Sequence, residues 1–203
     1  MRGVRRGGGA YDGGMDAPML SATFAAALDY EAYVHSGTEE QGRRWRQAYE
    51  AASLTGPQTQ LVQSFARRMH VLVVSGIWCG DCVQQGPLLQ RIAEANPVQV
   101  VLRLVDRDQH ADLSARLRIN GGGRVPVVLF LSEDFELCGT YGERTLSRYR
   151  AIAQRQLGAS CETGLVTAAA DEMAANLQDW LNEFERIQLM LRLSPRLRQR
   201  HGD

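Results

Sequence analysis

The sequence predicts an α/β fold in which a mixed sheet of about four strands is preceded by helices and followed by one long helix. Between residues 70 and 157, short β-branched runs alternate with helical segments in the order β-α-β-α-β-β-α. Only residues 132–134 separate the last two strands, which predicts an antiparallel hairpin. The 203 residues are 44% hydrophobic and 23% charged, which is ordinary for a globular protein.

The N-terminal part predicts a tail followed by helices. Residues 1–17 are rich in glycine and arginine and poor in apolar side chains, so we expect a disordered tail. Residues 18–56 are expected to form a helical extension, in which Thr38 and Gln41 have the spacing of a capping box. Helices are expected over residues 19–34, 39–53 and 56–69.

The central part supplies the strands. A β-branched run predicts a buried strand over 70–75, and the helix that follows it contains Pro87, which should kink it. Three glycines at 121–123 predict a flexible joint. The other expected elements are helices over 79–95, 112–117 and 143–157 and strands over 98–105, 125–131 and 135–141.

The C-terminal part predicts a linker over 158–166, then an amphipathic helix and tail over 167–203. Ser194-Pro195 should end the helix and leave a frayed tail. One apolar stripe runs along this helix, formed by Met173, Leu177, Trp180, Leu181, Phe184, Ile187 and Leu191. The stripe either covers the core of the same chain or packs against a second chain, and the pattern does not distinguish the two.

Charge and composition narrow the function classes. The formal net charge is zero and all 23 basic residues are arginine, so no global field favours nucleic acid or an anionic membrane. No apolar run is long enough to span a bilayer, and no signal peptide is evident. Four cysteines do not make a disulfide framework, so we expect a cytoplasmic, reducing location.

The segment Trp78-Cys79-Gly80-Asp81-Cys82 carries the chemistry. Two thiols two residues apart, between a strand and a helix, predict a redox-active disulfide Cys79–Cys82. At a helix N-terminus the backbone N–H groups and the helix dipole favour the Cys79 thiolate. Cys79 is the expected nucleophile and Cys82 the residue that resolves the mixed disulfide.

The neighbours of the two cysteines have two interpretations each. Asp81 either opposes the Cys79 thiolate by its charge and relays the proton of Cys82, or is a solvated acid of the first helical turn. Trp78 either offers a flat apolar face to a peptide or simply packs. Cys138 is expected to be a small buried residue, and Cys161 an exposed linker residue.

Over residues 57–157 the chain resembles the thioredoxin superfamily, in particular a bacterial thioredoxin-like subgroup with a WCxDC motif and extra N-terminal helices. The resemblance rests on the WCxxC motif at the first strand–helix junction, on Pro87 and on Val125-Pro126 before the hairpin. It implies a three-layer fold, and a cis-proline loop in which Val125 and Pro126 face the motif and bind substrate. The buried aspartate of thioredoxins is absent, because Val73 occupies its place.

These observations predict a thiol–disulfide oxidoreductase that reduces protein disulfides. Its substrates would be protein or small-molecule disulfides, and a dithiol or a reductase would recycle it. No bound cofactor is required, and no second CxxC motif completes a zinc site. The alternatives are a non-catalytic adaptor that binds a protein partner, and a thiol or metal sensor that uses Cys79 and Cys82 as ligands.

Overall fold

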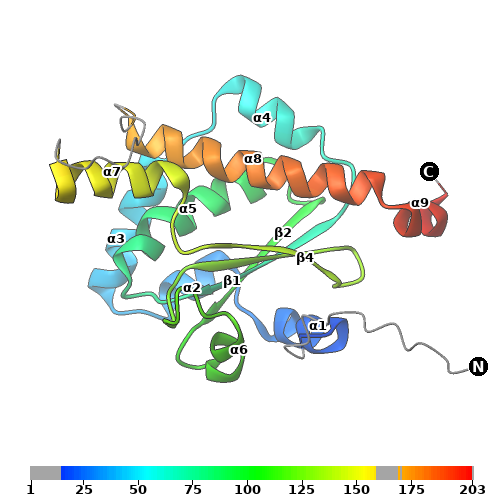
Figure 1. Cartoon of the computed structure of the whole chain (residues 1–203), viewed down its shortest axis with the longest axis horizontal. Coiled ribbons are helices and arrows are strands. Elements are labelled where there is room, and N and C mark those ends of the chain that lie inside the picture. Colours follow the sequence, from blue (N-terminus) through cyan, green and yellow to red (C-terminus); the bar gives the residue numbers. More distant parts are fainter. Residues whose placement is uncertain (1–14, 159–168, 170, 203) are drawn as a thin grey trace, which may run out of the picture.

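The computed structural model describes residues 15–158, 169 and 171–202. Its centre is a four-stranded mixed sheet in the order β2-β1-β3-β4 (Figure 1). The strands are β1 (Met69–Ser75), β2 (Val100–Asp106), β3 (Val127–Leu131) and β4 (Leu137–Gly142). β1 pairs with β2 in parallel and with β3 antiparallel, and β3 and β4 form the predicted hairpin. The α/β class and the mixed sheet are confirmed.

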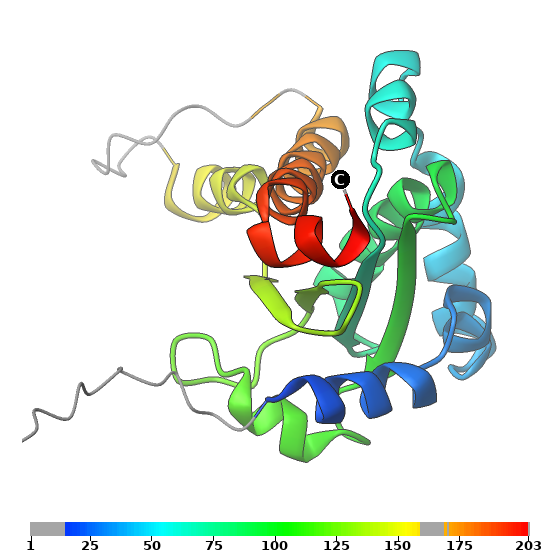
Figure 2. The same ribbon diagram turned by 90° about the vertical axis from the view of Figure 1, so that its right-hand side faces the viewer.

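Helices cover both faces of the sheet. Their bounds are α1 (Ala17–Ala26), α2 (Tyr30–His35), α3 (Glu39–Ala51), α4 (Gly56–Gln63), α5 (Gly80–Ala95), α6 (Ala111–Arg116), α7 (Leu146–Leu157), α8 (Glu172–Leu193) and α9 (Pro195–His201). The helix α1 and the long helix α8 lie on opposite sides of the sheet (Figures 1 and 2). The result is a sheet between two helical layers.

The C-terminal helix completes the core of its own chain. Six members of the predicted apolar stripe are buried, and only Met173 is partly exposed, at 37%. The ring of Phe184 meets Phe130 of β3 edge to face, with 5.2 Å between ring centroids. On the opposite face of the sheet, Phe24 of α1 packs against His70 of β1 at 5.0 Å. The stripe of α8 therefore covers the sheet within this chain.

The prediction of a single helix over 19–34 is wrong, because an extended residue, Leu28, separates α1 from α2. The backbone N–H of Leu28 donates to Leu104 O at 3.0 Å, and Leu104 N–H donates to Leu28 O at 2.8 Å. This bridge adds one extended residue to the outer edge of β2. Asp29 then caps α2 by accepting the Ala32 N–H at 2.8 Å. Local helix propensity is overridden by a backbone pairing with a distant strand.

Other boundaries also differ from the expectations. α1 already begins at Ala17, although the expected disordered tail extends to that residue; residues 1–14 lie outside the described part of the chain. α4 ends at Gln63, and β1 begins at Met69. Most of the expected linker, with Cys161, also lies outside the described residues.

The expectation of a frayed C-terminal tail is wrong as well. Pro195 follows the end of α8, as expected, but it also starts the short helix α9. Ser194 caps α9 by accepting the Leu197 N–H. Asp134, in the β3–β4 turn, binds the guanidinium groups of Arg196 and Arg200. These ion pairs fix α9 against the hairpin.

Candidate active site

The two cysteines of the motif lie where β1 gives way to α5. Cys79 is the N-cap of α5, and its N–H donates to Gly76 O at 2.9 Å. The side chain of Cys79 is half-buried, whereas Cys82 is completely buried one turn into the helix. The Gly76 N–H donates to Cys82 Sγ at 3.5 Å. Both thiols are free, and of the two only Cys79 is partly exposed.

The two thiols differ in their pKa values. The pKa of Cys79 is lowered to about 6, chiefly because the Cys82 side chain donates a hydrogen bond to it, and further because the backbone N–H groups of Cys82 and Asp81 do so. Burial and the charge of Asp81 oppose this shift. Burial raises the pKa of Cys82 well above its ordinary value. Near neutral pH, Cys79 is therefore the thiolate and Cys82 the thiol.

The loop before β3 faces the motif, as the resemblance implied. The peptide bond Val125–Pro126 is cis. The carbonyl oxygen of Val125 lies 3.6 Å from Cys79 Sγ, although the two residues are 46 positions apart. The fold therefore brings Cys79, Val125 and Pro126 together at one end of the sheet.

Trp78 stands at the exposed edge of this site. Its side chain is 45% exposed, and the Arg107 guanidinium lies 4.8 Å from the ring centroid. Arg107 also donates from Nη1 to Gly123 O at 3.0 Å. The arginine thereby connects Trp78 to the loop that precedes Pro126.

Asp81 is neither solvated nor alone, which corrects the interpretation of a solvated first-turn acid. Its side chain is 14% exposed and lies between two arginines. Arg144 approaches Oδ2, with Nη2 at 2.7 Å and Nε at 2.9 Å, and Arg148 Nε lies 3.1 Å from Oδ1. Their charges offset that of the carboxylate, so its opposition to the Cys79 thiolate is weakened.

The arginines around Asp81 belong to a larger charged network. The buried carboxylate of Glu143 accepts from Arg124 Nη1 at 2.8 Å and from the Tyr149 hydroxyl at 3.0 Å. It also lies 3.4 Å from Arg144 Nη1. Arg148 reaches Glu172, at the start of α8, at 2.6 Å. This network joins the first turns of α5, α7 and α8.

Trp45 of the N-terminal extension supports the turn before Cys79. The indole is completely buried, and its Nε1–H donates to Ile77 O at 3.0 Å. Gly86 of α5 leaves room for the ring, because a Cβ atom there would lie 2.3 Å from Trp45 Cζ3. The extension is thus part of the site's framework.

The contacts that Asp81 and Ile77 make with distant side chains were not predicted from the sequence. Arg144 and Arg148 lie where the sequence predicts the start of a helix, but nothing in their spacing indicates that both meet Asp81. Nothing in the local pattern around Trp45 connects it to Ile77, 32 residues away. Such pairings depend on packing alone.

Cys138 was expected to be buried, but the structure shows it only half-buried. Burial raises its pKa to about 11, and its Sγ contacts Glu136 O at 3.5 Å. Among the residues that the structure describes, no group of three or more His, Cys, Asp or Glu side chains could hold a metal ion. Within the same residues, no helix is long and apolar enough to cross a membrane.

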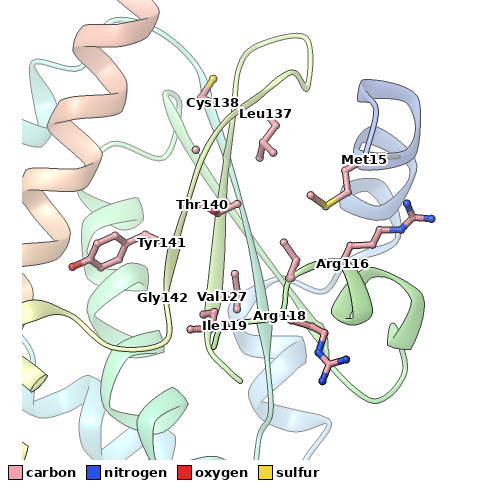
Figure 3. A pocket seen from close by; sticks show the side chains of 12 residues that line it. Met15, Arg116, Arg118, Ile119, Val127, Leu137, Cys138, Thr140, Tyr141 and Gly142 are labelled. Carbon is pink, nitrogen blue, oxygen red and sulfur yellow. The ribbon is translucent and has the colours of Figure 1, made fainter. Parts of the chain in front are cut away.

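A hollow of about 760 Å³ lies between the N-terminal end of α1, α6 and β4 (Figure 3). Met15, Arg116 and Arg118 line it from the helical side, and Leu137 and Thr140 line it from β4. Tyr141 points away from the helical side, toward α8, where its ring packs against Trp180. Neither cysteine of the motif lines this hollow.

The fold and the paired cysteines define a thioredoxin-like protein. A thioredoxin family model matches residues 27–154, more than half of the chain, and the chain belongs to the thioredoxin family. No protein with a curated description matches the chain.

The solved structures that are similar to this one include the following three. A protein of unknown function from Pseudomonas aeruginosa has a TM-score of 0.60 and 23% identity, over 80% of this chain and 97% of its own. An HIV epitope scaffold has a TM-score of 0.58 and 22% identity, also over 80% and 97%. Mitochondrial thioredoxin 3 of Saccharomyces cerevisiae, in its oxidised form, has a TM-score of 0.32 and 21% identity, over 47% and 86%. At these identities the likeness to the first two structures concerns the fold and not the activity.

Proposed function

We propose that this protein is a thiol–disulfide oxidoreductase that reduces protein disulfides in a reducing compartment such as the cytoplasm. One observation carries the proposal: a half-exposed Cys79 with a pKa lowered to about 6 lies beside a buried, protonated Cys82. Two thiols with a purely structural role do not need different protonation states. A nucleophile must be a thiolate, and its resolving partner must stay protonated until the second step.

The reaction begins when the Cys79 thiolate attacks one sulfur of the substrate disulfide. The substrate S–S bond breaks, a mixed disulfide forms on Cys79, and the other substrate sulfur leaves as a thiolate and takes a proton. Cys82 then loses its proton and attacks Cys79 Sγ. The Cys79–Cys82 disulfide forms, and the second substrate sulfur leaves. Two electrons pass from the dithiol to the substrate, and an external dithiol or reductase returns them.

The loop around Pro126 and the ring of Trp78 would receive the substrate. The Val125 carbonyl lies next to Cys79 Sγ, so an extended peptide could pair with this backbone while its disulfide meets the thiolate. Trp78 offers an exposed apolar face at the same place. No bound cofactor takes part.

Insulin reduction in the presence of dithiothreitol tests the proposal. We compare the wild type with Cys79→Ser and Cys82→Ser, and use Cys138→Ser as the matched control because the pKa of that thiol is raised to about 11. Cys79→Ser should remove the acceleration, Cys82→Ser should accumulate a mixed disulfide, and Cys138→Ser should match the wild type. Equal turbidity curves for the wild type and Cys79→Ser would reject the enzymatic function.

The same variants separate the alternatives. An adaptor would keep its partner binding after Cys79→Ser, since its surface and not its thiol would be in use. A metal sensor would co-purify with metal, and Cys82→Ser would release it. The oxidoreductase requires both thiols in turnover and a Cys79 that reacts with alkylating agents at mildly acidic pH.

A further inference from the structure

The proposed function requires the loop before β3 to stay close to Cys79. An extended substrate can pair with the backbone of Val125 only where Val125 O lies beside Cys79 Sγ, at the observed 3.6 Å. Three glycines at 121–123 precede this loop, and a Cβ atom added at Gly121 or Gly123 would meet nothing within 4 Å. Glycine restricts the backbone little, so other contacts must fix the position of Val125.

The side chain of Glu143 connects this loop to the rest of the site. Glu143 directly follows β4, and its Oε1 accepts hydrogen bonds from Arg124 Nη1 at 2.8 Å and from the Tyr149 hydroxyl at 3.0 Å. Arg124 immediately precedes Val125 in the chain. The carboxylate of Glu143 is only 7% exposed. A carboxylate so nearly removed from water depends on these charged and polar partners, because solvent cannot replace them.

The backbone around Glu143 is fixed to the helix that carries the motif and to the loop itself. Gln85 of α5 is completely buried, and its Nε2 donates to Glu143 O at 2.7 Å. Gly142, the preceding residue, packs closely on Pro126, since a Cβ atom at Gly142 would lie 2.3 Å from Pro126 O. The Glu143 side chain therefore reaches Arg124 from a backbone that is held on two sides.

Arg144 joins the same carboxylate to the motif. Its Nη1 lies 3.4 Å from Glu143 Oε1, and its Nη2 lies 2.7 Å from Oδ2 of Asp81, the residue that precedes Cys82. A chain of alternating charges thus runs from the loop to the first turn of α5, through Arg124, Glu143, Arg144 and Asp81. Linked ion pairs with buried members hold their positions better than an isolated exposed pair does.

We propose that Glu143 is a positioning residue, which holds Val125 beside Cys79 through its contact with Arg124. Glu143 takes no part in the exchange of sulfur–sulfur bonds. It acts on the backbone with which an extended substrate would pair, and this inference rests on the proposed function. Loss of the Glu143 charge should slow the reduction of a protein disulfide, while the intrinsic reactivity of the Cys79 thiolate stays the same.

Two disulfides with different requirements test this role. Insulin is a protein disulfide that would pair with the loop, whereas 4,4′-dithiodipyridine is a small neutral disulfide that needs only access to the Cys79 thiolate. Pre-reduced protein is mixed with each disulfide, and the second-order rate constant of protein oxidation is measured in a single turnover. A Cys138→Ser, Cys161→Ser background limits the reaction to the two cysteines of the motif.

We compare Glu143→Gln, Arg124→Gln and the double variant with the wild type. Each single variant should lower the rate constant with insulin about tenfold or more, the scale of a misplaced substrate, and change that with dithiodipyridine by less than about twofold. The double variant should lose no more than either single variant, because all three lack the same contact. The two substitutions change the net charge in opposite directions, so a direct effect of charge on the substrate would have opposite signs.

Glu133→Gln is the matched control. Glu133 is also a largely buried carboxylate beside an arginine, Arg67, but it lies in the β3–β4 turn, at the other end of the hairpin from the loop. Both rate constants should therefore match those of the wild type. Urea unfolding identifies a variant that does not fold. If Glu143→Gln is such a variant, Arg124→Gln tests the same contact from a side chain that is 41% exposed.

Several results overturn the positioning role. Equal losses with insulin and dithiodipyridine show that the thiolate or the fold is affected and not the loop. Effects of opposite sign in the two single variants, or additive losses in the double variant, show that Arg124 and Glu143 act separately. A wild type that reacts with dithiodipyridine but not with insulin removes the proposed function together with the inference. An active wild type with an unaffected Glu143→Gln removes the inference alone.

Discussion

Arg144 Nη2 lies 2.7 Å from Asp81 Oδ2, and this ion pair joins the motif to the segment just before α7, where Arg144 precedes the N-cap Thr145. Arg148 takes the second carboxylate oxygen at 3.1 Å. An acid placed between two redox cysteines would by itself raise the pKa of the nucleophile. Here two guanidinium groups offset it, and the pKa of Cys79 remains low.

Asp81→Asn should lower the pKa of Cys79 further. The substitution removes a negative charge that opposes the thiolate and leaves the two arginines beside it, so a shift of about half a unit to one unit is expected. The rate of iodoacetamide alkylation against pH measures it. Arg148→Gln should shift the midpoint in the opposite direction, and Glu40→Gln, in an exposed pair on α3, should leave it unchanged. A higher midpoint in Asp81→Asn would contradict this account of the charge.

Gly86→Ala should destabilise the protein by about 1–3 kcal/mol, because the added methyl overlaps a buried ring. The Cβ would lie 2.3 Å from Trp45 Cζ3, and that indole holds Ile77 O, two residues before Cys79. Gly56→Ala, at the first position of α4, meets nothing within 4 Å and serves as the control. Urea unfolding compares the two variants. Equal stability would show that Trp45 moves aside without cost.

Phe184→Ala should cost about 3–5 kcal/mol, since it opens a cavity under α8. The ring is completely buried against Phe130 of β3. Leu193→Ala, 73% exposed on the same helix, should change the free energy of unfolding by less than about 0.5 kcal/mol. If chemical denaturation gives the two variants the same stability, α8 is not part of the cooperative core.

Asp134→Asn should lower stability at pH 7 by about 1 kcal/mol, because it breaks the contacts with Arg196 and Arg200. The Arg196 guanidinium holds the pKa of Asp134 well below its ordinary value. A depressed pKa contributes stability above the unfolded value of about 4, and the contribution fades as the pH falls toward the folded value. The gap between wild type and variant should therefore narrow below about pH 4.

Thermal unfolding at several pH values, with Glu136→Gln in the same turn as the control, measures this gap. A gap that stays constant from pH 7 to pH 3 would show that the carboxylate charge is not the cause. A gap in Glu136→Gln of the same size would assign the effect to the turn as a whole. Glu136 is exposed, so we expect neither.

The strands and the paired cysteines could be predicted because their signals are local. The run from Val71 to Val74 is apolar and rich in valine, and the structure buries all seven residues of β1. The break at Leu28 could not be predicted, because its cause is the backbone of Leu104, on a strand that has no local relation to it. The residues on either side of Leu28 favour a helix, so local propensity does not indicate the interruption.

The sequence by itself determined the order β-α-β-α-β-β-α of the central part, from β1 to α7, and placed two thiols at a helix start, since periodicity and spacing depend on neighbouring residues. Tertiary structure alone decided that Asp81 meets Arg144 and Arg148, which are 63 and 67 residues away. Such pairings are set by how helices pack on the sheet, and the free energy of packing depends on the whole core and not on any one segment.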